Sequence, residues 1–186
     1  VAAKKSRVIV KRGLVILPHY SFAEVDSLHM NVDLMVVPNQ SGNPKKVTVD
    51  FIKNHYTGEN KILSVCDGSA TVAATGIYDG KQLTTHSSDL AGLKKQFKKP
   101  SWVTQVSVTQ NGNLFSTAGV ANATEGSLTV IKELFGREAM QEALMEVHYP
   151  YTEIKKDHQN LLADTNSIYR SLRSGEIKKT EKIGVL

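Results

Sequence analysis

The sequence predicts an α/β fold: a three-layer sandwich with a mostly parallel sheet and helices on both faces. First, apolar runs of strand length alternate with helical stretches, which is the pattern of a parallel sheet covered on both sides. Second, the run Asp33–Val37 is compact and closed by Pro38, as in a strand buried on both faces. Third, the strand-like run Ile62–Val65 is followed closely by a helix-forming stretch, Ala70–Ala74. With 186 residues and 40% hydrophobic content, the chain is large enough for one well-buried domain.

In the N-terminal part of the chain, two short strands are predicted at Val8–Val10 and Leu14–Leu17, on either side of Gly13. A polar loop follows the predicted strand Asp33–Val37. Pro44 then suits a first helical turn, because its fixed φ angle is helical and its missing N–H is not needed there. The sequence therefore predicts a helix at Val47–His55.

Three strands and three helices are predicted after the helix that ends near residue 75. In chain order they are the strand Gln82–Thr85, the helix Asp89–Phe97, the strands Val103–Thr109 and Leu114–Thr117, and the helices Ala121–Phe135 and Glu138–Val147. Asn111–Asn113 is a strong hairpin signal between the last two strands. Gly136 is expected to end the first of the last two helices.

Cys66 is the only cysteine, and it directly follows the strand-like run 62–65. Ser64 and Gly68, two positions away on either side, are small. This is the local chemistry of a nucleophile elbow, a sharp strand-to-helix turn in which bulky neighbours would clash. A cysteine there lies at a helix N-terminus, where unpaired N–H groups and the positive end of the helix dipole favour a thiolate. The alternative is a buried cysteine that acts as a small hydrophobic side chain.

The loops that follow three predicted strands meet at one edge of the predicted sheet. They come after Val37, Val65 and Thr117. In open parallel sheets, active sites lie at the carboxyl ends of the strands. This convergence favours the catalytic interpretation of Cys66.

The stretch Ser64–His86 resembles the ThiJ/PfpI superfamily, whose members have the class I glutamine amidotransferase-like fold. It matches that family's elbow cysteine, a helix ending in a Gly-hydrophobic-x-x-Gly turn, and a strand ending in Thr-Thr-His. Further segments resemble the family in the same order: Val15–Phe22, with His19 in place of an aspartate, Asp33–Pro38, and Ser116–Val120 followed by Glu125. The resemblance covers about residues 7–147 and implies a flavodoxin-like sandwich.

The resemblance implies that Cys66 is the reactive thiol and that His86 is the histidine near it. A histidine within hydrogen-bond reach of a thiol can take or return its proton. The alternative is a strand-end histidine whose ring is satisfied by the backbone. The other implied site residues are backbone donors to an oxyanion and supporting residues: Asp67, Gly68, Asn39 and Gln40 as donors, and Thr85 and Gly119 beside them.

The sequence departs from the family at three places. Pro38-Asn39-Gln40 stands where the family has Pro-Gly-Gly, so side chains would crowd the second oxyanion donor. Asp67 replaces the histidine that follows the cysteine in the superfamily's proteases, which argues against a protease. The family's first strand, first helix and second strand have no counterpart before Val8, and the carboxylate that this region supplies is missing with them.

Residues 1–150 are predicted to form the ThiJ/PfpI-like domain, and residues 151–178 a helical extension or linker. Residues 179–186 resemble the family's first strand. Either the chain is a piece of a longer protein with two such domains, or it is permuted and its last strand fills the first strand's place. An ordinary strand at a sheet edge is the remaining alternative. A truncated sheet has an unpaired edge, so we expect a homo-oligomer or association with the rest of a longer protein.

Two functions follow from the resemblance. One is a cysteine-dependent enzyme acting on a small molecule, of the hydrolase, hydratase, glyoxalase or deglycase type, in which Cys66 attacks an electrophilic carbon. The other is a ligand- or redox-sensing domain of the kind attached to AraC-like regulators, in which the cysteine does not turn over substrate.

Composition narrows the possible partners. The net charge is +5, but the lysines stand in scattered pairs without interleaved aromatic residues, so nucleic-acid binding is not expected. No apolar run is long enough to span a membrane, and no motif for a metal, nucleotide or other cofactor is present. A single free cysteine suits a reducing compartment, so the sequence predicts a cytoplasmic protein.

Overall fold

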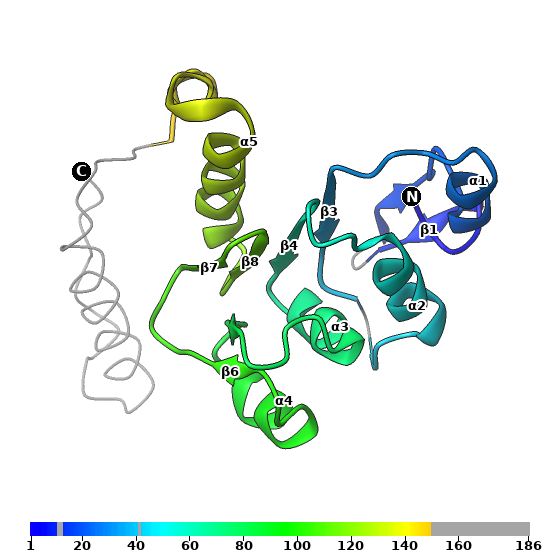
Figure 1. Ribbon diagram of the computed structural model, residues 1–186, viewed down its shortest axis with the longest axis horizontal. Helices are drawn as coiled ribbons and strands as arrows, with labels where there is room; N and C mark the ends of the chain where they lie inside the picture. The colour runs from blue at the N-terminus through cyan, green and yellow to red at the C-terminus, as the bar shows by residue number, and fades with distance from the viewer. Residues whose placement is uncertain (11–12, 41, 150–186) are drawn as a thin grey trace. The chain divides into compact units, whose positions relative to one another are not determined.

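A computed structural model describes residues 1–10, 13–40 and 42–149 (Figure 1). The chain divides into two compact units, Val1–Met140 and Gln141–Leu186. The predicted helical extension (151–178) and final strand (179–186) lie outside the described residues.

The first unit is built on a four-stranded sheet in the order β3-β4-β8-β7. The strands are β3 (Leu34–Val37), β4 (Lys61–Val65), β8 (Leu114–Thr117) and β7 (Val108–Asn111). β3, β4 and β8 are parallel, and β7 joins β8 in an antiparallel hairpin. The predicted mostly parallel sheet is therefore confirmed.

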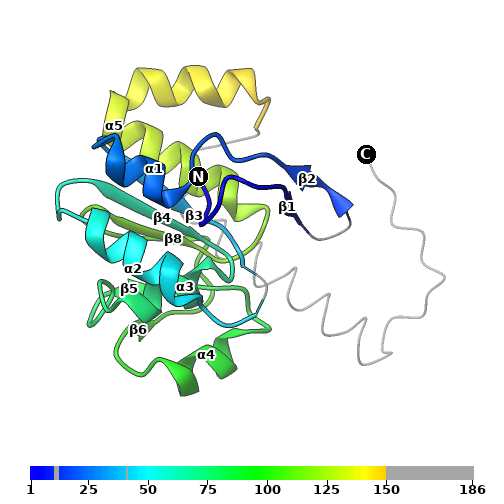
Figure 2. The same ribbon diagram turned by 90° about the vertical axis from the view of Figure 1, so that its right-hand side faces the viewer.

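Helices cover both faces of this sheet (Figures 1 and 2). On one face, α2 (Lys46–His55) and α3 (Gly68–Thr75) enclose a core that includes Ile62, Val72 and Tyr78. On the other face, Leu63 and Phe115 pack with Val130 of α5 (Asn122–Glu146). This is the predicted three-layer arrangement, and it follows from the alternation of side chains along each strand.

β3 corrects one prediction. The run 33–37 was expected to be buried on both faces, but Val36 is 53% exposed while Met35 and Val37 are buried. β3 is the edge strand of its sheet, so its only strand partner among the described residues is β4. An apolar run alone does not distinguish a central strand from an edge strand, because both bury at least one face.

Two small sheets complete the first unit. β1 (Val8–Ile9) and β2 (Val15–Ile16) form an antiparallel pair, as predicted around Gly13. β5 (Gln82–Leu83) pairs in parallel with β6 (Ser101–Trp102), and α4 (Leu90–Gln96) connects them.

The predicted strand 103–109 is largely wrong. Only its last two residues, Val108 and Thr109, belong to β7, and the two-residue strand β6 was missed. Gln105 has φ 59°, a left-handed conformation that interrupts an extended chain. The alternating apolar residues between 103 and 109 predicted one strand, but the chain bends within this segment, and no glycine or proline there indicates the bend.

The short helix α1 (Phe22–Ser27) was also missed, although its start has a recognisable signal. The Glu24 backbone N–H donates to Ser21 Oγ at 3.2 Å, and the Ser21 N–H donates to Glu24 Oε2 at 2.7 Å. This reciprocal capping box satisfies two N–H groups that a helix start leaves unpaired. The Ser21 N–H, the Lys5 ammonium and the Ser21 hydroxyl all bond to the Glu24 carboxylate and lower its pKa to about 2.

The break between the last two predicted helices is confirmed. Within α5, Gly136 has φ 89° and ψ 177°, which are not helical angles, so two helical segments meet at this residue. Only a residue without a side chain adopts this φ readily, so the position of Gly136 determines where the first helical segment ends.

Candidate functional site

The turn between β4 and α3 has the geometry of a nucleophile elbow. Cys66 has φ 54°, in the left-handed region that a side chain disfavours. Its N–H donates to the Thr117 carbonyl oxygen at 3.1 Å, and its own carbonyl accepts from the Ser69 N–H at 3.1 Å. These two bonds hold the strained residue between the end of β8 and the first turn of α3. The predicted sharp turn at Cys66 is confirmed.

Gly68 allows α3 to begin against the end of β3. A Cβ atom at this position would overlap the Val37 carbonyl oxygen and would lie 3.1 Å from the Pro38 carbonyl carbon. Both are backbone atoms, which cannot rotate away. The glycine therefore places the elbow next to the loop that contains Asn39 and Gln40.

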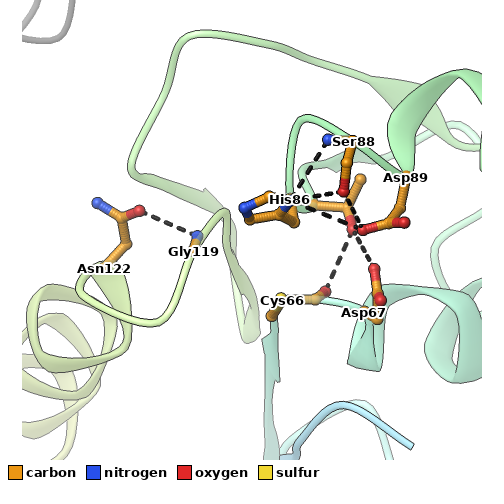
Figure 3. Close-up of polar contacts among 8 residues, drawn as sticks. Cys66, Asp67, His86, Ser88, Asp89, Gly119 and Asn122 are labelled. Carbon is orange, nitrogen blue, oxygen red and sulfur yellow. Dashed lines mark hydrogen bonds and ion pairs between the residues drawn. The ribbon is translucent and has the colours of Figure 1, made fainter. Parts of the chain in front are cut away.

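His86 lies at the same edge, just after β5, and side chains of its own loop hold its ring (Figure 3). Nδ1 is 2.8 Å from Ser88 Oγ and 3.7 Å from Asp89 Oδ2. Ser88 Oγ donates in turn to Asp89 Oδ2 at 2.8 Å. The side chain of His86 is 50% exposed. Within the described part of the chain, no hydrogen bond joins the imidazole to the Cys66 thiol, although both groups lie at the same edge of the sheet.

Thr85, the residue before His86, connects the loop that contains His86 to the elbow at Cys66. Its buried hydroxyl lies 3.4 Å from the Cys66 carbonyl oxygen and 3.3 Å from Asp67 Oδ1. Asp67 thus faces Thr85, and its side chain makes no capping bond to α3. The Thr85 hydroxyl thus lies within hydrogen-bond distance of two consecutive elbow residues, and its supporting role in the site stays a prediction.

A second buried hydroxyl fixes the strand that leads to His86. Ser116 Oγ accepts a hydrogen bond from the Thr84 N–H at 2.9 Å. The same oxygen is 2.5 Å from Thr109 Oγ1. Ser116 is wholly buried in β8, so this bond attaches the end of β5 to the central sheet.

The electrostatics of the elbow differ from the sequence-based expectation of a stabilised thiolate. Burial raises the pKa of the Cys66 thiol; the Asp67 N–H, which hydrogen-bonds the sulfur, lowers it, and the carboxylates of Asp67 and Asp89 raise it again. The pKa of Asp67 is itself raised by burial, then by the charge of Asp89 and a hydrogen bond to it. The helix N-terminus is present as predicted, but two carboxylates and partial burial outweigh it. Cys66 is therefore a thiol at neutral pH.

This direction gives a testable prediction. The rate of iodoacetamide alkylation of Cys66, measured against pH, should inflect above the free-thiol value of ~8.5, because burial and nearby negative charge oppose deprotonation. The same chain in denaturant is the control, and its inflection should return to the free-thiol value. An inflection in the folded protein well below that of the denatured chain would contradict the assignment of a neutral thiol.

The remaining predicted residues are Asn39, Gln40 and Gly119. Among the described residues, neither Asn39 nor Gln40 hydrogen-bonds to Cys66. The Gly119 N–H donates to Asn122 Oδ1 at 3.0 Å, a cap at the start of α5. Sequence reasoning missed Asn122, Ser88 and the site role of Asp89. The polar run that follows His86 was the available signal, since serine and aspartate often bond to neighbouring groups in loops.

No group of three or more histidine, cysteine, aspartate or glutamate side chains suited to a metal ion occurs in residues 1–10, 13–40 and 42–149. Over those same ranges, no helix is both long enough and apolar enough to cross a membrane.

Comparison with known proteins identifies the family. Residues 1–133 match the family model described as the DJ-1/PfpI family. The chain belongs to the DJ-1/PfpI family. This confirms the resemblance to the ThiJ/PfpI superfamily that the motif around Cys66 indicated.

Among relatives of this DJ-1/PfpI chain, DJ-1beta of Drosophila melanogaster is 29% identical over 136 residues, which is 70% of each chain. Its crystal structure matches with a TM-score of 0.69 and 28% identity over 79% of each chain, which confirms the predicted flavodoxin-like fold. Isonitrile hydratase of Pseudomonas putida is 28% identical over 141 residues, covering 74% of this chain and 59% of that protein. The HTH-type transcriptional regulator GbdR of Pseudomonas aeruginosa is 26% identical over 134 residues, covering 70% of this chain and 36% of that protein. The chain thus spans less than two thirds of the hydratase and about a third of the regulator.

Proposed function

We propose that this DJ-1/PfpI chain is a cysteine-dependent enzyme that acts on a small molecule with an electrophilic carbon. The reaction would be a hydrolysis or hydration, or a glyoxalase- or deglycase-type conversion. The observation that carries the proposal is Cys66 itself: a strained left-handed residue, with the Asp67 N–H at its sulfur, at a sheet edge shared with His86. A cysteine that served only as packing would not need this backbone conformation.

In the proposed reaction the thiol needs a base, because it is neutral at physiological pH. His86 takes the proton as the sulfur attacks the electrophilic carbon, and it returns the proton when the product leaves. Backbone N–H groups of Asp67 and Gly68, together with the loop Asn39–Gln40, stabilise the negative charge that develops on the substrate. Since no hydrogen bond links His86 to Cys66, the proton passes to the ring when substrate orders the site, or through one water.

The test is turnover of two probes, an aryl isonitrile and methylglyoxal, by the wild-type chain and by Cys66→Ala. The wild type should convert at least one probe, and C66A should show no conversion above buffer. A His86→Gln variant should lose about 10²-fold or more, the usual contribution of a positioned base. Equal rates for the wild type and C66A, or no conversion of either probe by the wild type, would contradict the proposed chemistry.

A second candidate is a ligand-sensing domain. It is favoured by the match to GbdR, of which this chain corresponds to only a part, and by the neutral state of the thiol. In that case a small molecule would bind at the elbow without turnover, and the chain would act with the rest of a longer protein or with a second copy. A rise in thermal stability on addition of a probe, equal in wild type and C66A and without product, would support this candidate.

A further inference from the structure

The hydroxyl of Ser88 lies between the ring of His86 and the carboxylate of Asp89 (Figure 3). Both distances are 2.8 Å, so both contacts are full hydrogen bonds. A serine hydroxyl has one hydrogen and can donate to only one of the two neighbours. An ionised carboxylate can only accept. Ser88 therefore donates to Asp89 Oδ2, and its oxygen is left to accept a hydrogen bond from His86 Nδ1.

One contact competes with this arrangement. The Ser88 backbone N–H lies 3.3 Å from the same Nδ1 and would donate to it if the nitrogen carried no proton. The Ser88 hydroxyl is nearer to Nδ1, and Asp89 Oδ2, 3.7 Å from Nδ1, attracts a proton placed there. Two groups thus favour a protonated Nδ1 and one weaker contact opposes it. The balance depends on the negative charge of Asp89.

We propose that Ser88 and Asp89 are positioning residues that keep the neutral imidazole of His86 protonated on Nδ1, leaving Nε2 as the proton acceptor of the site. The tautomer of a histidine is determined by the hydrogen bonds of its other nitrogen, and here that nitrogen is held by Ser88. The ring is half exposed, so without these partners little else in its loop would restrict it. The assignment of a tautomer does not depend on the function of Cys66, but its chemical use rests on the function proposed above.

With Nδ1 protonated, Nε2 of His86 can accept the proton of the Cys66 thiol. The proton of the Cys66 thiol moves to Nε2, and the S–H bond pair stays on sulfur, so the products are a thiolate and an imidazolium. The imidazolium keeps its Nδ1–H on Ser88, and its positive charge faces Asp89. The Asp67 side chain, held by the Thr85 hydroxyl, lies on the elbow side of the same site. The opposite tautomer would present an N–H toward the site, and it could not accept this proton.

The experiment is ¹⁵N NMR of the imidazole nitrogens in the full chain, with His86 assigned by a His86→Gln variant and recorded at pH 8, where an ordinary histidine is neutral. In the wild type, Nδ1 should be the protonated nitrogen. In Asp89→Asn, the new amide can donate to Ser88 Oγ, which frees the serine hydrogen for Nδ1. In Ser88→Ala, the oxygen that accepts from Nδ1 is lost, the backbone N–H at 3.3 Å can donate to Nδ1, and Asp89 Oδ2 at 3.7 Å lies beyond hydrogen-bond distance. Both variants should shift the proton to Nε2, inverting the populations of the two tautomers.

Ser87→Ala is the matched control, because Ser87 is the neighbouring exposed serine and forms no hydrogen bond with His86 within the described residues. It should keep the wild-type tautomer. A wild-type ring already protonated on Nε2, or variants D89N and S88A that keep the proton on Nδ1, would overturn the proposal.

A second measurement separates this proposal from the proposed function. Alkylation of Cys66 at pH 7.5 should slow about 10-fold in S88A if His86 serves as the base; D89N is not used in this measurement, because it also removes a carboxylate that raises the pKa of the thiol. An inverted tautomer with unchanged alkylation supports the positioning role of Ser88 and Asp89, and it counts only against His86 as the base of the thiol chemistry.

Discussion

Gly68→Ala is expected to lower the free energy of unfolding by about 3 kcal/mol, the upper range for overpacking in a closely packed interior. The added methyl group would overlap the Val37 carbonyl oxygen. That oxygen belongs to the backbone of β3, so relief requires the start of α3 to move away from the sheet. Cys66, two residues earlier, would move with it. Loss of stability should therefore be accompanied by loss of Cys66 chemistry.

The measurement is urea denaturation of G68A against Gly92→Ala. Gly92 lies within α4, and a Cβ there would meet nothing within 4 Å. Alanine at an open helical position stabilises by about 0.5–1 kcal/mol. G92A should thus be as stable as the wild type or more so. Equal behaviour of the two variants would show that α3 does not approach β3 as closely as the structure has it.

Tyr78→Ala is expected to cost about 4 kcal/mol. Tyr78 is wholly buried in the core between the sheet and α3, and removing a large buried ring leaves a cavity. Its hydroxyl donates to the Phe115 carbonyl oxygen at 2.9 Å. Burial raises the pKa of this hydroxyl, so it stays a donor over the accessible pH range. Tyr78→Phe keeps the ring and loses this bond, together with a longer one of 3.4 Å to the Ile62 carbonyl oxygen, at a cost of about 1–2 kcal/mol.

Thermal or urea unfolding of both variants separates the two contributions. Tyr20, which lies at the surface with the Lys5 ammonium 5.8 Å from its ring, provides the control. Tyr20→Phe should change stability by less than about 0.5 kcal/mol. If Y78F were as unstable as Y78A, the hydrogen bond rather than the packing of the ring would dominate, against this expectation.

The sequence predicted the parts of the fold that depend on periodicity and on glycine. The apolar runs that became β3, β4 and β8 were each located within a residue, and Gly136 marked the break in α5. The exposure of Val36 was not predictable in the same way. Whether one face of a strand is covered depends on residues distant in sequence, and a local pattern has no information about them.

At the candidate site, the sequence indicated which residues come together and left their bonding open. The elbow at Cys66 follows from a local pattern of small residues, so it could be predicted. The direction of the thiol pKa could not, because it results from burial and from the carboxylates of Asp67 and Asp89 acting against the helix N-terminus. Asp89 was assigned only to the start of a helix. Its place beside the ring of His86 depends on the conformation of the loop.

The bond from the Thr84 N–H to Ser116 Oγ makes one amide proton a reporter of the site. The acceptor is a side-chain oxygen in the central sheet, whereas the amide belongs to the segment that leads to His86. Exchange of this proton with deuterium therefore requires the His86 segment to separate from the sheet, an opening that can occur without global unfolding. The lifetime of this single proton in heavy water measures how firmly the protein holds its histidine in place.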